Sequence, residues 1–146
     1  MSLAEWVGRT LEEVEPDSVI IRRLLVAAER NIADARVTQI SVENRFDAAY
    51  KAIMQIANAA LQANGYRTKS SVPGHHRTMI RLLAETAGID NDTIIVLDAL
   101  RKQRNAADYS GDTVPQTALD TCLDQAADLL RRVTDWIEAN RPQLLR

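Results

Sequence analysis

The stretch VENRFDAAYKAIMQIANAALQANG, residues 42–65, carries the clearest helical pattern in the chain. Its larger apolar side chains recur every three to four residues: Phe46, Tyr50, Ile53, Ala57 and Leu61. This spacing puts them on one face of a helix. Ser41 followed by Asn44 is a weakened capping box, and Gly65 suits the left-handed conformation that ends many helices. The stretch therefore predicts a helix of about 24 residues with one buried face.

Two further helices are predicted around this stretch. Asp17 or Ser18 can cap the first, which runs to about Arg36. Before it, Val14 and Pro16 close a short amphipathic piece. After residue 65, segment 67–76 is a predicted loop because it is rich in Ser, Pro and Gly. Segment 75–88 is a predicted shorter helix, ended by Gly88.

The last part of the chain predicts two more helices. Segment 89–109 places Ile94, Leu97 and Leu100 on one face, and SGDTVP ends it. The final helix begins near Pro115, a favourable residue for a first turn. Its apolar residues follow in steps of three and four: Leu119, Cys122, Ala126, Leu129, Val133 and Trp136.

Composition supports the same fold class. The chain has 146 residues, of which 46% are hydrophobic, enough for one domain with a continuous core. Aromatic residues make up only 4%, whereas Ala and Leu are abundant, which favours helix packing over sheet stacking. We therefore predict an all-α protein, with residues 1–146 forming a single up-and-down bundle of four to five helices.

Charge and hydropathy limit the partners and the location. The formal net charge is -2, so any contact with nucleic acid requires a local basic patch. No segment approaches the roughly 18 apolar residues of a membrane span, and the N-terminus lacks the pattern of a signal peptide. Cys122 is the only cysteine, and we expect it to be a small core residue. A cytoplasmic protein without membrane contact is expected.

A polar cluster lies at the end of the helix predicted over 89–109. Its members are Arg101, Arg104, Asn105, Asp108 and Tyr109. Arg and Asn can bind phosphate or base edges, Asp can accept a proton or orient Arg, and the Tyr hydroxyl can donate a hydrogen bond. Arg104 follows Leu97 by seven residues, so it continues the inward face, with Asp108 one turn further along. The alternative is an ordinary ion pair between Arg104 and Asp108 that stabilises the helix.

The remaining reactive side chains indicate no further chemistry. His75 and His76 are adjacent, so their side chains diverge by about 100° on a helix and cannot easily ligate one metal. We expect no metal or cofactor, and one of the two histidines as a buried hydrogen-bonding residue that holds the loop. Neither histidine is placed as a base for Cys122, and no Gly-rich phosphate loop precedes a helix.

Four segments together resemble a known family. They are RFDAAYKAIMQIANAALQANGYR, then GHHRTMIRLL, then LRKQRNAADYSG, then a long final amphipathic helix. In this order they resemble the HEPN domain (higher eukaryotes and prokaryotes nucleotide-binding), over about residues 17–140. The resemblance implies a bundle of four or five helices, often paired into a homodimer whose cleft joins two copies of an Arg-containing motif.

The resemblance also implies a range of functions. Many HEPN proteins are metal-independent ribonucleases, including toxins whose antitoxin partner is a minimal nucleotidyltransferase, and others bind nucleotide or RNA without catalysis. The catalytic signature is Arg, four to six residues, then His. Arg104 and Asn105 match its beginning, but Tyr109, Ser110 and Gly111 occupy the positions where His is required, and no His follows His76.

Three functional hypotheses follow. The first is a non-catalytic HEPN-like module that binds RNA, a nucleotide or a protein partner in a toxin–antitoxin or defence system. In it Arg104 lies near a partner protomer, Asp108 holds Arg104, Asn105 caps or contacts, and Tyr109 closes the cleft. The second is a ribonuclease that uses Arg104 with Asp108 or Tyr109 in place of the missing His. The third is a structural helical homodimer.

Overall fold

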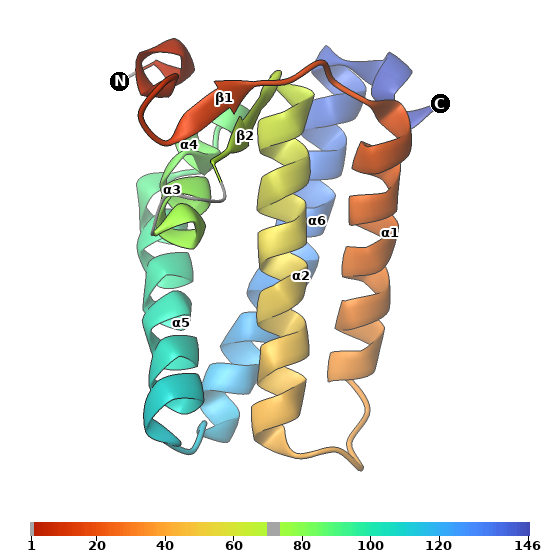
Figure 1. The fold of residues 1–146 in the computed structure, drawn as a ribbon. Helices are drawn as coiled ribbons and strands as arrows, with labels where there is room; N and C mark the ends of the chain where they lie inside the picture. Colours follow the sequence, from red (N-terminus) through yellow and green to blue (C-terminus); the bar gives the residue numbers. More distant parts are fainter. Residues whose placement is uncertain (1, 70–73) are drawn as a thin grey trace.

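The computed structural model describes residues 2–69 and 74–146 (Figure 1). The elements follow one another in chain order: a 3₁₀ turn Leu3–Trp6, β1 Leu11–Glu13, α1 Ser18–Ala35, α2 Val42–Ala63, β2 Tyr66–Thr68, α3 His75–Arg81, α4 Leu83–Ala87, α5 Asn91–Ser110, α6 Gln116–Asn140 and a 3₁₀ turn Pro142–Leu145. The chain is dominated by helices, so the prediction of an all-α helical bundle is confirmed.

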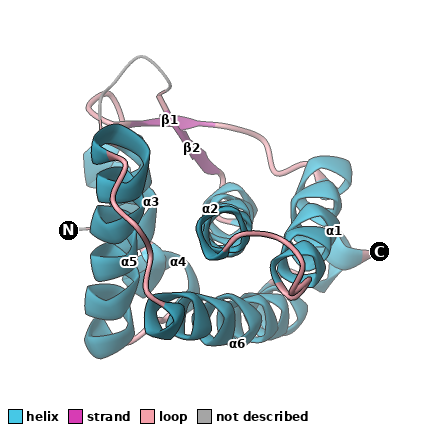
Figure 2. Cartoon of the chain, turned by 90° about the horizontal axis from the view of Figure 1, so that it is seen from below, coloured by secondary structure: helices cyan, strands magenta, loops and turns pink. Residues whose placement is uncertain are grey.

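Helix α2 is the centre of the bundle. Seen end-on, it is surrounded by α1, α6 and α5, with the two short strands on the remaining side (Figure 2). Twelve of its side chains are buried, which is more than on any other described helix. This agrees with its sequence, because apolar residues occupy well over half of the helix surface. The predicted inward residues Phe46 and Tyr50 are both buried.

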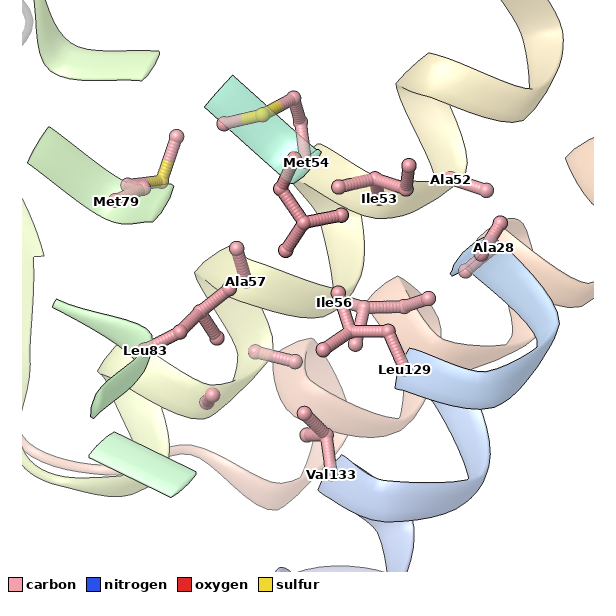
Figure 3. Packing of buried hydrophobic residues seen from close by; sticks show 14 of the residues in the cluster. Ala28, Ala52, Ile53, Met54, Ile56, Ala57, Met79, Leu83, Leu129 and Val133 are labelled. Atoms are coloured by element: carbon pink, nitrogen blue, oxygen red, sulfur yellow. The ribbon is translucent and has the colours of Figure 1, made fainter. Parts of the chain in front are cut away.

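Small side chains let the neighbouring helices approach α2 closely. Ala28 of α1 and Ala52 of α2 are both fully buried and lie on the same side of the close-up view, with Ile56 and Leu129 nearby (Figure 3). Close packing of this kind gains dispersion energy along the whole helix contact. The contact between α1 and α2 is the most extensive in the molecule, followed by that between α2 and α6.

The apolar stripe predicted for the last helix is confirmed except at its end. Leu119 through Val133 are buried at the expected steps, and Cys122 is fully buried as a core residue. Trp136 is only partly buried, and Ile137 takes the next core position instead. Alternating steps of three and four residues average 3.5, slightly less than the 3.6 residues of a helical turn, so the stripe drifts slowly around the helix. A step of four residues after Val133 offsets this drift, whereas a step of three would add to it.

The predicted caps and stops of the helices are present. The Asp17 carboxylate accepts a hydrogen bond from the Val19 amide at 2.9 Å, and the Ser41 hydroxyl accepts one from the Asn44 amide at 3.1 Å. Gly65 follows α2 with φ +89°, and Gly88 ends α4 with φ +65°. Both are left-handed conformations that glycine adopts without strain.

The structure adds two short strands, and the predicted loop 67–76 is wrong in part, because its residues 67 and 68 belong to β2. The N-terminal amphipathic piece and the segment after Gly65 contain strands, which pair antiparallel with Leu11 opposite Thr68 and Glu13 opposite Tyr66. Each strand has only three residues, and the two strands are more than fifty residues apart in the sequence. Local patterns therefore do not reveal the pairing. Of the predicted loop 67–76, residues 70–73 lie outside the described part.

The helix predicted over 75–88 is divided in two. Leu82 ends α3 and precedes α4, and its backbone has φ -75° and ψ -6°. Leu82 and Leu83 are both buried on the inner side of this bend. The described residues therefore contain six α-helical segments, because one helix of the predicted bundle of four to five is divided in two. None of the described helices is long and apolar enough to cross a membrane.

Candidate functional site

Arg104 lies on the side of α5 that faces α2. Its Nε is 2.9 Å from an Asp108 carboxylate oxygen and 3.7 Å from an Asp47 carboxylate oxygen. Its guanidinium carbon is 5.6 Å from the centre of the Tyr50 ring, within the range of a cation–π contact. The side chain is 26% exposed. The predicted inward direction of Arg104 and its ion pair with Asp108 are therefore both confirmed.

The guanidinium group of Arg104 is held in place by ion pairs, but not all of its N–H groups have a hydrogen-bond partner. Its Nε is buried, and the 2.9 Å contact with Asp108 is an ion pair whose N–H direction does not meet hydrogen-bond geometry. Within residues 2–69 and 74–146, no hydrogen bond engages its two terminal NH₂ groups. These groups form the half of the guanidinium fork that binds phosphate or carboxylate in a bidentate manner.

Tyr50 connects Arg104 to a histidine on another helix. Its hydroxyl is 3.3 Å from Nδ1 of His76, and the two ring centres are 5.9 Å apart. Burial raises the pKa of Tyr50 to about 12, although the nearby positive charges of Arg104 and Arg101 oppose the shift. The side chain is therefore a neutral phenol at neutral pH, able to donate or accept a hydrogen bond.

His76 lies in the first turn of α3 and is half-buried. Burial lowers its pKa below the usual value, and the charges of His75, Arg104 and Arg101 lower it further. The imidazole is consequently neutral at neutral pH. The expectation of a histidine that is buried and hydrogen-bonded is met in part, since His76 contacts Tyr50 of α2 but keeps an exposed side.

A hollow of about 300 Å³ opens between α2, α3 and α5. One face of α2 supplies most of its wall: Asp47, Tyr50, Lys51, Met54, Gln55 and Asn58. Their spacing of three and four residues is that of a single helical stripe. His76 and Met79 of α3 and Arg104 of α5 complete it. We call this space the α2 hollow.

A second hollow, of about 190 Å³, lies on the other side of the His76–Arg104 pair. The predicted residues Arg101, Arg104, Asn105 and Tyr109 line it, together with residues 74–77 at the start of α3. We call it the Arg101 hollow. Because His76 and Arg104 line both spaces, they form the wall between them.

The other predicted site residues take different positions around these hollows. Asp108 lines neither hollow and acts only through its ion pair with Arg104. Asn105 lies within α5, six residues before the cap at Gly111, so it lines the Arg101 hollow and does not cap the helix. Tyr109 is 83% exposed at the rim and does not close the hollow within this chain.

Arg101 is fixed by a neighbour on its own helix. Its Nε donates a 2.8 Å hydrogen bond to Asp98. This bond, more than the surrounding positive charges, lowers the pKa of Asp98. Asp98 therefore stays ionised and holds Arg101 at the edge of the Arg101 hollow.

Residues on α2 and α3 complete the site, and sequence reasoning did not assign them to it. The pattern predicted Tyr50 as a core residue and either His75 or His76 as a buried residue that holds the loop, which gave no reason to place Tyr50 or His76 beside Arg104. Among the described residues, no group of His, Cys, Asp and Glu is arranged to hold a metal ion. Cys122 is not part of the site, because burial raises its pKa to about 12 and keeps it a thiol inside the core.

The arrangement combines an oriented guanidinium, a neutral imidazole and a phenol at the junction of two hollows. It suits an anion with an organic part, such as a phosphate ester. Comparisons with protein-family models and with curated protein sequences find no match to this chain. The chemical interpretation of the site therefore rests on its own geometry.

Proposed function

We propose that this protein is a HEPN-like, non-catalytic module that binds the phosphate of RNA or of a nucleotide at Arg104. The observation that carries the proposal is the position of the Arg104 guanidinium. Asp108 and Asp47 lie at its Nε and the Tyr50 ring lies beside its guanidinium carbon, while its terminal NH₂ groups remain available between two hollows. A guanidinium oriented in this way loses little entropy when it binds an oxyanion.

The surrounding groups suit the rest of such a ligand. His76 and Tyr50 offer hydrogen-bonding atoms beside the phosphate position, and Met54 and Met79 offer an apolar surface for a base or sugar. Flexible thioether side chains adapt to flat rings of different shape. These features favour a nucleotide or RNA over a bare inorganic anion.

The proposal includes the wider setting implied by the HEPN resemblance. We propose a homodimer, a cytoplasmic location and a role in a toxin–antitoxin or defence system, with a nucleotidyltransferase-type antitoxin as a candidate protein partner. The exposed Tyr109 ring at the rim of the Arg101 hollow is consistent with a partner surface that covers this side. Light scattering of the purified chain tests the dimer, and a monomer at all concentrations would contradict it.

A metal-independent ribonuclease is the second candidate, favoured by one observation. His76 lies next to Arg104 although it comes from a different helix, so an imidazole is present without the Arg-to-His spacing of the family motif. If Nδ1–H donates to the Tyr50 oxygen, the Nε2 lone pair is free to take the proton of a ribose 2′-hydroxyl. Attack of that oxygen on phosphorus would then release the 5′-oxygen and leave a cyclic phosphate.

Two variants of Arg104 test the binding proposal. The wild-type protein, Arg104→Ala and Arg104→Lys are titrated with a 2′-O-methyl RNA, which cannot be cleaved by this route, and with nucleoside monophosphates. We expect Arg104→Ala to weaken binding at least about tenfold and Arg104→Lys to restore only part of it, because Lys lacks the planar fork. Unchanged affinity in Arg104→Ala would contradict the proposed function.

The ribonuclease candidate is tested separately with unmodified RNA and no added metal. Cleavage that requires both Arg104 and His76 would establish catalysis, and loss of the 2′,3′-cyclic product in His76→Gln would identify the imidazole as the proton acceptor. Binding of the 2′-O-methyl RNA by a wild-type protein that leaves unmodified RNA intact would support the non-catalytic module.

A further inference from the structure

A third hollow, of about 430 Å³, lies between α3 and α5. The two helices run side by side on the face of the bundle away from α1 (Figure 1). Arg77 and Arg81 line this hollow from α3, and Asp98 and Lys102 line it from α5. Arg77 also lines the Arg101 hollow. We call the third space the Arg81 groove; it adjoins the Arg101 hollow at Arg77, which lines both spaces.

The Arg81 groove carries positive charge that the protein does not neutralise. Arg77 and Arg81 are exposed and one helical turn apart, an arrangement in which like charges repel. Within the described residues, neither forms an ion pair. Lys102 lies 3.6 Å from Asp98, but that carboxylate already accepts the hydrogen bond from Arg101. An anion bound between these side chains would reduce the repulsion further than Asp98 does.

The three hollows together form one cationic surface on an acidic chain. Six cationic side chains line them: Lys51, Arg77, Arg81, Arg101, Lys102 and Arg104. Asp47, Asp98 and Asp108 are the carboxylates that line the hollows or pair with these cations, which leaves an excess of three positive charges. The whole chain has a formal net charge of -2, so the positive charge is concentrated here.

We infer that the Arg81 groove binds the next phosphates of the strand whose first phosphate binds at Arg104, so that the ligand is a single-stranded oligonucleotide and not a mononucleotide. This inference rests on the proposed function. The strand runs from the α2 hollow past the wall of His76 and Arg104, across the Arg101 hollow, and along α3. Arg77, Arg81 and Lys102 then act as phosphate contacts.

The α2 hollow favours a nucleic acid over another polyanion. Its apolar surface consists of Met54 and Met79, which lie at the edge of the core (Figure 3). The side-chain oxygens of Gln55 and Asn58 already accept hydrogen bonds from Asn31 and Gln62, at 2.8 and 3.1 Å. Their NH₂ groups are thus left to donate to ring nitrogens or carbonyl oxygens of a base. A polymer of carboxylates would present no flat ring to this space.

The test compares ligands of increasing length on three proteins. Nucleoside monophosphates and 2′-O-methyl di-, tetra- and octanucleotides of mixed sequence are titrated into the wild type, the double variant Arg81→Ala/Lys102→Ala, and the control Arg23→Ala/Arg30→Ala. The control removes the same charge from exposed positions of α1, on the other side of α2. Circular dichroism and thermal melting check that all three are folded.

We expect affinity to rise with length in the wild type and the control. In Arg81→Ala/Lys102→Ala the octanucleotide should bind at least about tenfold more weakly, while monophosphate affinity stays the same. The slope of log affinity against log salt should become shallower by ~0.7 for each phosphate that the variant no longer neutralises. Matched RNA and DNA octanucleotides show which backbone is preferred, and either one bound in this manner supports the inference.

Two results would overturn the inference. One is an octanucleotide that binds no more tightly than a monophosphate, with the double variant equal to the control. If monophosphate binding still depends on Arg104, the proposed function would remain supported although the inference fails. If no ligand binds at all, both the proposed function and the inference would be contradicted. The other is polyglutamate that competes as strongly as the octanucleotide and depends on the same residues, because this would mean that the groove recognises charge alone.

Discussion

Helices α1 and α5 lie on opposite sides of α2 and differ in what they bury. Helix α1 has 18 residues and places five of them in the core, all of them apolar. Helix α5 has 20 residues, but only Leu97 and Leu100 are buried, and Arg104 takes the next inward place. Helix α1 therefore contributes mainly to the stability of the bundle. Helix α5 packs fewer apolar side chains, and it places the Arg104 cation and the walls of two hollows beside α2.

The difference between α1 and α5 shows how a small bundle can carry a site without losing its fold. The contacts of α2 with α1 and α6 form a continuous apolar core that does not involve Arg104. The stripe of α2 from Asp47 to Asn58 lines the hollow shared with α3 and α5, and among the described residues only Gln55 of this stripe also hydrogen-bonds to α1, through Asn31. Substitutions on the two sides of α2 should therefore have separable effects on folding and on binding.

The largest effect is expected on the α1 side. Ile21 of α1 is fully buried in the core, so Ile21→Ala should lower the free energy of unfolding by about 2–5 kcal/mol, because the variant buries less apolar surface and leaves a cavity. Urea denaturation measures the change. Val26→Ala on the same helix is the control, because Val26 is 56% exposed and its truncation should destabilise far less. Equal decreases in the two variants would mean that α1 does not pack as described.

A smaller effect on stability is expected at the inward cation of α5. Arg104→Met replaces the guanidinium beside the Tyr50 ring by an apolar side chain and removes a buried Nε that makes no hydrogen bond. The free energy of unfolding should change by no more than about 1 kcal/mol in either direction, because partly buried ion pairs give little net stability. Binding of 2′-O-methyl RNA should nevertheless weaken at least about tenfold, as in Arg104→Ala. A destabilisation comparable to that of Ile21→Ala would show that Arg104 is mainly structural.

The smallest effect is a pH dependence that arises from His76. Because folding lowers the pKa of this imidazole, the unfolded chain binds more protons once the pH falls below its usual pKa of about 6.5. Stability is therefore complete above that value and decreases as the pH falls toward the folded pKa. Urea midpoints of wild type and His76→Gln, measured from about pH 8 to about pH 5, should diverge in this window. Parallel curves would contradict the lowered pKa.

The helices of this protein were largely predictable from sequence because their signals are local. The Asp17 and Ser41 caps, the stop at Gly88 and the spacing of the apolar residues each act within one or two turns. The strands were missed because three-residue segments carry no usable periodicity. The division at Leu82 was also missed, since no Gly or Pro marks it in the sequence. Leu82 and Leu83 are both buried at this division, and their burial depends on the tertiary packing.

The candidate site was predictable only where one helix supplied it. Arg101, Arg104, Asn105 and Tyr109 meet in one hollow because α5 continues unbroken to Ser110, and Asp108 pairs with Arg104 at the predicted spacing. The roles of Tyr50 and His76 were not visible. Their contact joins residues 26 positions apart, and nothing in either local pattern specifies it.

The sequence by itself determined the helical class, most helix boundaries and the inward direction of Arg104. These follow from backbone capping and from a period of 3.6 residues, which are properties of short segments. Only the tertiary structure decided that a histidine of α3 and a tyrosine of α2 lie beside that arginine, and that the arginines of α3 extend its hollow into a groove. Such contacts depend on how three helices pack against one another, and no single helix encodes that arrangement.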